Sequence, residues 1–411
     1  MGNKLQVSKL SYWLPIFAVP VIFWNCYWYV GFNANYTKLL EFIIALVLLF
    51  IYLKDILNTQ KGYFEHDVSL FILSFALSIF TSFVYWEQNP SLTFRAGVTT
   101  LSILYFFTLR RRQVDNKNIE NICVVFSIIY ALLWLYAFYK APMVVFGNLD
   151  EVEDTRGFYR ILQLHSIDLV ALLYCISLDK ISRSSKKWIW IIVACGSFAL
   201  IFLSLTRILL AGIIAVTVVY LLRKKAIIII LLAAVFSFGG TDYLMKSEIF
   251  SGMVEMTKSQ IGDKSESNLR MPEYTGAFEL FPFHVGTAVF GNGSPHVASS
   301  YGQFEERLKA QYYFNRSDAG YVGLYTTYGI FMIIIMLRLL IRVIKCKVPS
   351  EYFPYKLFIY FLFIINLTTY TFWSYGIAFM ISLYMLDKSK RQDTSMLLDN
   401  ERNLSQSNNQ Y

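Results

Sequence analysis

Arginines are the residues in this sequence whose chemistry is most specific. A guanidinium group stays charged when it is partly buried, and it binds phosphate oxygens through two parallel hydrogen bonds. Several arginines lie at the ends of apolar segments or in the long polar segment 245–319, where snorkelling of each single side chain to an interface is the alternative explanation. Together they predict a binding site for an anion such as a phosphate group. The candidate residues are Arg207, Arg270, Arg156, Arg160, Arg95 and Arg316.

Asp318 is the first candidate for acid–base chemistry beside these arginines. It lies in Arg316-Ser317-Asp318-Ala319-Gly320, where a polar segment meets an apolar one. A carboxylate at such a boundary can take a proton from a hydroxyl group. The alternative is that Asp318 caps the N-terminus of the following helix.

Three further residues are candidates for the same role. His165 and Asp168 are three positions apart and would share one face of a helix. An ionisable residue inside an apolar segment indicates function, although Asp168 could also hold helices together by pairing with a buried arginine or with His165. His284 is the last candidate, and an exposed surface histidine is the alternative for it.

The signatures of several other chemistries are absent from the sequence. It contains no P-loop, no dinucleotide-binding fingerprint and no nucleophile elbow. Its His, Cys and carboxylate residues do not have the spacing of a metal site, and its five cysteines do not resemble a disulfide framework. We therefore expect neither a metal nor a cofactor.

Composition identifies the class of protein that holds these residues. Of 411 residues, 56% are hydrophobic and 16% are charged, and the mean hydropathy is +0.47. Soluble domains are about 45–50% apolar and about 25% charged, so a disordered chain or an ordinary cytosolic enzyme is excluded. The net charge of +9 is explained by basic loops that orient membrane helices, and we expect no nucleic-acid partner.

The apolar segments have the length that a membrane-spanning helix needs. A bilayer core requires about 20 apolar residues per helix, which predicts about twelve spans. The last two are short and could form one re-entrant pair. The predicted spans are 12–31, 38–55, 68–86, 92–109, 119–140, 160–178, 188–205, 207–222, 226–244, 320–341, 356–372 and 375–387.

Every second connection between these spans is rich in Lys and Arg. Basic loops stay in the cytoplasm, so both termini are expected there, and the connection 245–319 is expected to be an external domain of short helices. This predicts five parts: spans one to five in 1–149, spans six to nine in 150–244, the periplasmic loop 245–319, spans ten to twelve in 320–390, and a disordered cytoplasmic tail 391–411.

Four short motifs over about residues 150–340 occur in the order found in one family. They are Arg156-Gly157-Phe158 with His165-Ser166; Ser204-Leu205-Thr206-Arg207; Arg270 followed later by Phe290-Gly291-Asn292-Gly293; and Ser317-Asp318-Ala319-Gly320-Tyr321 followed by Tyr328-Gly329-Ile330. With these motifs the chain resembles the O-antigen and capsular polysaccharide polymerases of the Wzy type, in the superfamily that also contains the O-antigen ligases. Residues 1–149 contribute only topology and Arg95.

The resemblance implies an all-α, GT-C-like protein of the bacterial inner membrane, and a metal-independent, inverting glycosyl transfer at the periplasmic face. Donor and acceptor would be oligosaccharides on undecaprenyl diphosphate, and a chain-length regulator would be a partner protein. Arg207 and Arg270, then Arg156, would hold the diphosphate, and Asp318 would be the base.

Two other functions remain open. An O-antigen ligase is the alternative within the superfamily, although ligases typically carry His-Asn where this chain has Asp318. A polysaccharide flippase or other transporter is the alternative from another class; its positive charges would line a cavity reachable from both sides of the membrane.

Overall fold

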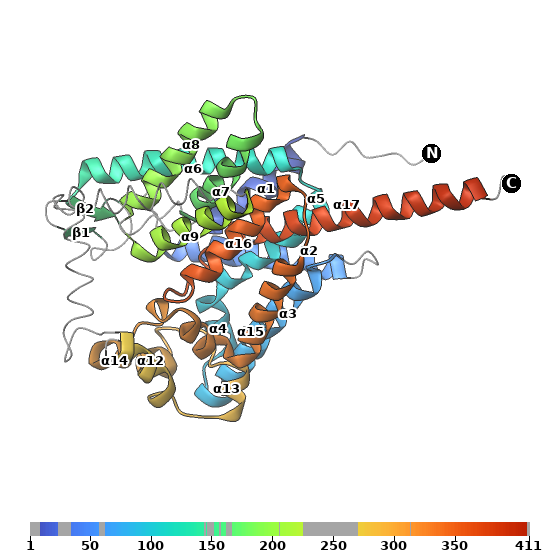
Figure 1. The fold of residues 1–411 in the computed structure, drawn as a ribbon. Coiled ribbons are helices and arrows are strands. Elements are labelled where there is room, and N and C mark those ends of the chain that lie inside the picture. The colour runs from blue at the N-terminus through green and yellow to red at the C-terminus, as the bar shows by residue number, and fades with distance from the viewer. Residues whose placement is uncertain are drawn as a thin grey trace.

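The protein is mainly helical in a computed structural model (Figure 1). This confirms the expected all-α class, with one short β-hairpin as the exception. The structure describes residues 9–23, 34–56, 62–143, 145, 152–155, 158–161, 167–204, 206–224, 270–312 and 314–408.

The elements follow one another in three groups. The first group contains α1 (Lys9–Phe23), α2 (Ala34–Ile56), α3 (Glu65–Trp86), α4 (Pro90–Ala96), the 3-10 helix η2 (Val98–Leu104), α5 (Tyr105–Arg112) and α6 (Asn116–Lys140). The second contains β1 (Val152–Thr155), β2 (Phe158–Ile161), α7 (Ile167–Arg183), α8 (Lys187–Leu203) and α9 (Arg207–Arg223). The third contains α12 (Arg270–Glu279), α13 (Val285–Phe290), α14 (Ser300–Tyr312), η4 (Arg316–Asp318), α15 (Gly320–Lys345), η5 (Ser350–Tyr352), α16 (Phe353–Ile365) and α17 (Gly376–Asn408).

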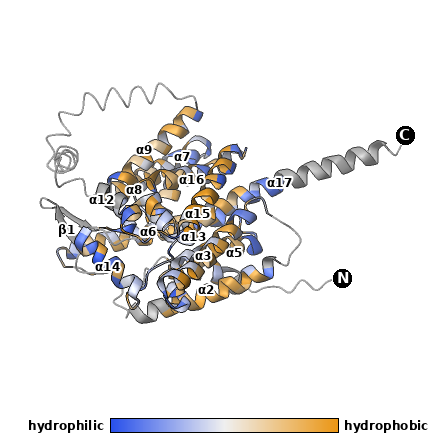
Figure 2. Ribbon diagram, turned by 90° about the horizontal axis from the view of Figure 1, so that it is seen from below, coloured by the Kyte–Doolittle hydropathy of each residue, from blue (hydrophilic) through white to orange (hydrophobic). Residues whose placement is uncertain are grey.

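Apart from 226–244, which lies outside the described residues, every predicted span overlaps a helix. By length and composition, 3 helices of the described chain can each cross a membrane, namely α3, α6 and α15. A fourth crossing is possible if the pair α4 and η2–α5, bent by 68°, forms one span. The protein therefore has helices apolar enough for a membrane (Figure 2), and the remaining spans stay predictions.

Helix α6, one of the helices long enough to cross a membrane, has one buried apolar face and one exposed apolar face. Side chains at every fourth position, Ile122, Phe126, Tyr130 and Trp134, are buried. Ile128 and Leu132 on another face are 55% and 61% exposed. A large exposed apolar face is unusual in water but expected where a helix faces lipid.

The start of α7 differs from the prediction. The sixth span was expected to begin at residue 160, but Phe158–Ile161 form a strand that pairs antiparallel with Val152–Thr155. Aromatic and β-branched residues dominate this segment and favour strands. Helix α7 consequently begins at Ile167, so Asp168 lies in its first turn rather than one to two turns inside.

The tail also differs from the prediction of disorder. Helix α17 continues from Gly376 to Asn408, which covers most of the segment 391–411. Residues 389–408 contain no Gly or Pro. Extending an existing helix avoids the cost of nucleation, and Arg391 supports the extension by pairing with Asp387 one turn earlier (3.0 Å).

Several connections that the sequence identifies as basic lie together at one end of the helices. Arg110, at the end of α5, forms an ion pair with Glu65 at the start of α3 (2.5 Å). Asp387 of α17 accepts a hydrogen bond from the backbone N–H of Phe64 (2.9 Å). These contacts bring the segments near residues 64, 110 and 387 to a common end, and the connections that hold the candidate site are at the opposite ends of α3 and α15.

Candidate functional site

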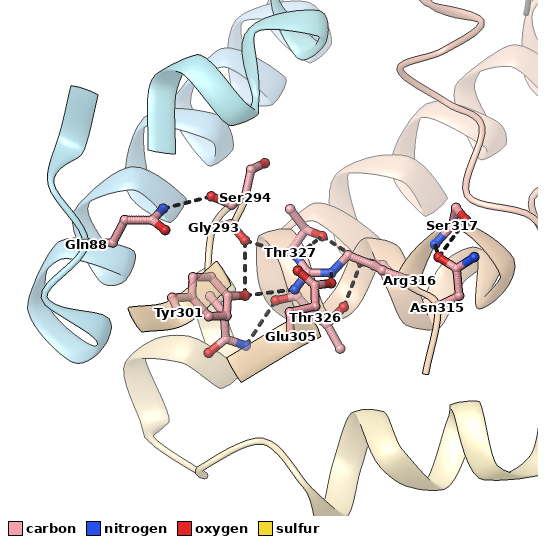
Figure 3. Close-up of polar contacts among 12 residues, drawn as sticks. Gln88, Gly293, Ser294, Tyr301, Glu305, Asn315, Arg316, Ser317, Thr326 and Thr327 are labelled. Carbon is pink, nitrogen blue, oxygen red and sulfur yellow. Dashed lines mark hydrogen bonds and ion pairs between the residues drawn. The ribbon is translucent and has the colours of Figure 1, made fainter. Parts of the chain in front are cut away.

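Arg316 is the centre of a buried polar cluster where α3 ends and α15 begins (Figure 3). Its Nη1 donates to the carbonyl oxygen of Gly293 (3.1 Å) and to Oγ1 of Thr327 (3.0 Å). Its Nη2 donates to the hydroxyl of Tyr301 (2.8 Å), and its Nε lies 3.0 Å from Oε1 of Glu305. The guanidinium therefore joins η4, α14, α15 and the segment after α13.

The electrostatics of this cluster keep Arg316 charged although it is buried. Burial alone would lower the pKa of the guanidinium, but Glu305 and Tyr301 outweigh it and raise the pKa above its usual value. Burial raises the pKa of the Tyr301 hydroxyl, so this group stays protonated. A buried charge with these partners organises structure. The structure thus gives Arg316 a structural role in place of the expected contact with a diphosphate.

The Gly291–Gly293 segment docks on a break in α15. Gly329 has φ +72°, which interrupts the helix and releases carbonyl groups from their intrahelical partners. The backbone N–H of Asn292 donates to the carbonyl oxygen of Thr326, and that of Gly293 donates to the carbonyl oxygen of Thr327 (both 2.9 Å). The segment therefore donates hydrogen bonds to backbone carbonyl groups of α15 that lipid could not hydrogen-bond.

Glycine is required at both ends of this segment. Gly291 and Gly293 have φ values of +82° and +76°, which L side chains rarely adopt. A Cβ at Gly291 would lie 2.1 Å from the carbonyl oxygen of Thr327, and a Cβ at Gly293 would lie 2.7 Å from the carbonyl oxygen of Ser78. The Gly-x-Gly motif thus allows this segment to pack closely between α3 and α15.

A second broken helix faces the first. The bend between α4 and η2 occurs at Gly97, and Thr100, just beyond it, shares a hydrogen bond with Tyr328 beside the break in α15 (Oγ1 to Oη, 2.6 Å). Gln88, just before α4, donates to the carbonyl oxygen of Ser294 (2.8 Å). The segment after α13 therefore lies between both breaks.

Arg95 and His296 lie at the rim of this assembly. Arg95 is exposed near the end of α4. His296 is half-buried; its backbone N–H donates to Oε1 of Gln88 (3.0 Å), and its Nδ1 accepts from the N–H of Ala298 (3.2 Å). Burial lowers the pKa of His296, and the charge of Arg95 lowers it further. The imidazole is therefore largely neutral at pH 7 beside an exposed cation.

Asp318 is exposed on η4. Its Oδ2 accepts a hydrogen bond from Nδ2 of Asn315 (3.0 Å), and its Oδ1 accepts from the hydroxyl of Ser317 (3.4 Å). The N-cap position of α15 is occupied by Ala319, without a side-chain cap. The alternative reading of Asp318 as a helix cap is therefore wrong, and its carboxylate faces solvent.

Asp168 and His284 have partners that the sequence did not indicate. Asp168 is 2% exposed, and its Oδ2 accepts from the backbone N–H of Ala378 in the first turn of α17 (3.3 Å). A carboxylate at a helix N-terminus is stabilising, so Asp168 links α7 to α17. His284 is exposed and stacks on the ring of Tyr85 (4.7 Å).

The remaining arginines are distributed over other elements. Arg207 is half-buried at the first residue of α9, as the Ser-Leu-Thr-Arg motif led us to expect. Arg160 is in β2 and Arg270 begins α12. Arg156 and His165 lie outside the described residues. Helix α4, which carries Arg95, packs on α3 and η2, whereas α9 packs on α16 and α7, so Arg95 and Arg207 belong to different groups of helices.

Gln88, Tyr301 and Glu305 were not singled out from the sequence as members of this site. Their importance comes from contacts between residues up to 211 positions apart, which no local pattern reveals. One signal was available: Glu305 and Arg316 both lie in the connection 245–319, for which short helices were expected, and a carboxylate there suits a neighbouring arginine.

Within the described ranges, no group of three or more His, Cys, Asp or Glu side chains could hold a metal ion. The site offers cations, neutral donors and one exposed carboxylate, which suit an anionic or polyhydroxylated ligand. Comparison with known proteins finds no matching family model and no curated protein with significant similarity.

Proposed function

We propose that the protein is a polysaccharide polymerase of the bacterial inner membrane. It joins oligosaccharide repeat units carried on undecaprenyl diphosphate into O-antigen or capsule, at the periplasmic face. One observation carries the proposal. The Gly-x-Gly motif, which is part of the resemblance, accepts a hydrogen bond at the carbonyl oxygen of Gly293 from Arg316 (3.1 Å, 23 positions apart), and Arg316 directly precedes the Ser317-Asp318-Ala319-Gly320-Tyr321 motif of the same resemblance. Motifs of one reaction are expected to share one site.

The transfer that we propose is inverting and independent of metal. Negative charge builds up on the leaving diphosphate, so preorganised cations lower the barrier. Arg207 supports this role by its position. A cation at the first residue of a helix is unfavourable to the helix dipole, whereas an anion binds well at a helix N-terminus. Arg207 at the first residue of α9 therefore does not stabilise the helix, but together with the N–H groups of the first turn it can bind a phosphate.

The acceptor hydroxyl must lose one proton, for which one base is sufficient. Asp318 is our candidate because its carboxylate is exposed and lies two residues from Arg316 on a 3-10 helix that the cluster holds rigidly. His165 stays the next candidate. Asp168 is less suitable, since its carboxylate is buried against α17.

A flippase or other transporter is the second candidate function, and one observation favours it. Transporters commonly bind substrate between discontinuous helices, and here two broken helices meet through Thr100 and Tyr328. An O-antigen ligase has no comparable support in the structure.

One experiment separates these functions. The purified protein is reconstituted with fluorescent oligosaccharide repeat units on undecaprenyl diphosphate, with and without EDTA, and Asp318→Asn is the matched variant. A ladder of polymers that survives EDTA and disappears with the variant supports the proposal. Movement of the fluorescent lipid across the membrane without a ladder would support a transporter, and transfer only to an added lipid A core acceptor would support a ligase.

A further inference from the structure

The connection that carries α13 contains a long stretch without charge. No Asp, Glu, Lys or Arg occurs between Glu279 and Glu305, although charged residues are frequent on either side of it. Charged side chains are costly within a bilayer and are therefore rare in segments that contact lipid. The stretch thus has the composition of a segment at the membrane rather than of an aqueous loop.

Helix α13 packs against two helices that are long and apolar enough to span. It contacts both α3 and α15, and the three lie side by side in both ribbon views (Figures 1 and 2). At its start, a Cβ at Gly286 would lie 2.6 Å from the ring of Tyr85 near the end of α3. At its end, the ring of Phe290 contacts that of Phe331 in α15 (5.9 Å). The helix therefore follows the outer parts of both candidate spans.

The free side of this element is apolar. Phe283 is 78% exposed and Val285 is 71% exposed. They adjoin the stack of His284 on Tyr85 (4.7 Å), which connects them to the outer end of α3. Exposed apolar residues of α3 continue from there in a helical stripe: Leu73, Phe80, Phe83 and Val84. One apolar surface thus runs from the body of a candidate span onto α13.

We infer that Phe283 and Val285 insert into the outer leaflet of the membrane, so that α13 is an interfacial lipid-binding element. The occupant of this surface is the acyl-chain region of ordinary phospholipids, because the surface is continuous with that of a candidate span and carries no charge. Burying exposed apolar side chains in lipid is favourable because it removes apolar area from water. This inference does not depend on the reaction that the protein catalyses.

Spin labelling tests the inference in the full-length protein. Phe283→Cys and Val285→Cys are labelled and reconstituted in vesicles of phosphatidylethanolamine and phosphatidylglycerol, and the labelled native chain provides the background from its own cysteines. Phe80→Cys on α3 is the reference for lipid, and Lys309→Cys, exposed on α14, is the reference for water. Accessibility is measured to oxygen, which concentrates in lipid, and to a polar nickel chelate. The substituted side chains point away from the protein, so folding should be preserved.

We expect the ratio of oxygen to nickel accessibility at 283 and 285 to match that at 80 and to exceed that at 309. A ratio equal to that at 309 would show that the surface faces water and would overturn the inference. Low accessibility to both reagents would overturn it as well, because it would show that another protein surface, such as a second copy of the chain, covers α13.

Discussion

Arg316 donates from Nη1 to the carbonyl oxygen of Gly293 over 3.1 Å, and this bond holds the segment after α13 against η4. The same nitrogen donates to Thr327, so one guanidinium fixes both the docking segment and the helix on which it docks. The groups at the rim, namely the exposed Arg95 and Asp318 and the half-buried His296, are on elements attached to this cluster. The geometry of the candidate site therefore depends on a residue that does not itself face solvent.

Replacing Arg316 should primarily reduce stability. Arg316→Lys retains the charge but cannot reach Gly293, Thr327, Tyr301 and Glu305 together. Each buried acceptor that loses its hydrogen-bond donor costs roughly 1–3 kcal/mol. We expect a clear fall in the melting temperature in detergent. The control is Arg307→Lys, at an exposed position on α14, which should change stability by less than about 0.5 kcal/mol. A normal melting temperature for Arg316→Lys would argue against the structural role.

The glycines of the docking segment should be intolerant of a side chain. Gly291→Ala forces a non-glycine residue to φ +82° and a Cβ against the backbone of Thr327. Such backbone strain costs roughly 1–3 kcal/mol before the clash is counted. Gly196→Ala is the matched control, because nothing lies within 4 Å of a Cβ there and Ala favours a helix over Gly by about 1 kcal/mol. Recovery of monodisperse protein after heating should fall for the first variant and stay equal or rise for the second.

Arginine at position 207 should not be replaceable by lysine. If Arg207 and Arg270 bind a diphosphate through paired hydrogen bonds, a single ammonium cannot reproduce the geometry. Arg207→Lys and Arg270→Lys are each expected to lose most polymerisation while the protein inserts and accumulates normally. Polymer ladders and membrane protein levels measure the two quantities. Full activity in both variants would exclude a site in which guanidinium groups bind the diphosphate through paired hydrogen bonds.

Replacing Asp318 should reduce turnover and leave the stability of the protein unchanged. Asp318→Asn retains the size of the side chain but removes the proton acceptor, and loss of general-base catalysis typically reduces turnover by roughly two to four orders of magnitude. Because Ala319 occupies the cap position and Asp318 is exposed, Asp318→Ala should cost less than about 0.5 kcal/mol. Normal polymerisation by the Asn variant would transfer the role of base to His165.

The predicted orientation can be measured with reporters. Fusions at Ser267, in the predicted external loop, and at Asn408, at the end of α17, should report opposite sides of the membrane, because every second connection is basic. A reporter active only in the cytoplasm and one active only in the periplasm provide independent readings. The same side for both positions would mean that the number of spans between them is not the predicted one.

The sequence was informative wherever local patterns decide structure. Apolar segments predicted the positions of the three helices that are long and apolar enough to cross a membrane, α3, α6 and α15, since the length of such a segment sets the length of a helix that can cross a bilayer. The start of α9 at Arg207 was expected from the Ser-Leu-Thr-Arg motif of the resemblance. The strand 158–161 was missed because a short apolar run fits a helix and a strand equally well, and its polar partner 152–155 forms a strand only through that pairing. Helix α17 was too short in the prediction because a polar composition was taken to indicate disorder.

Only the tertiary structure decided which polar residues are partners. A side chain's type shows what it can bind, but whether it faces solvent or another helix depends on contacts between residues far apart in the sequence. Asp168 and Asp318 were both candidate bases, the first inside a predicted span and the second at the start of another. In the structure Asp168 is buried against the N-terminus of α17, and Asp318 is exposed on η4. Arg95, at the edge of a predicted span, and Arg316, in the predicted external loop, were both candidates for binding the anion. In the folded protein Arg95 lies at the rim, whereas Arg316 is surrounded by Glu305, Tyr301, Thr327 and Gly293. These partners are needed because a buried guanidinium is stable only where most of its donors find acceptors.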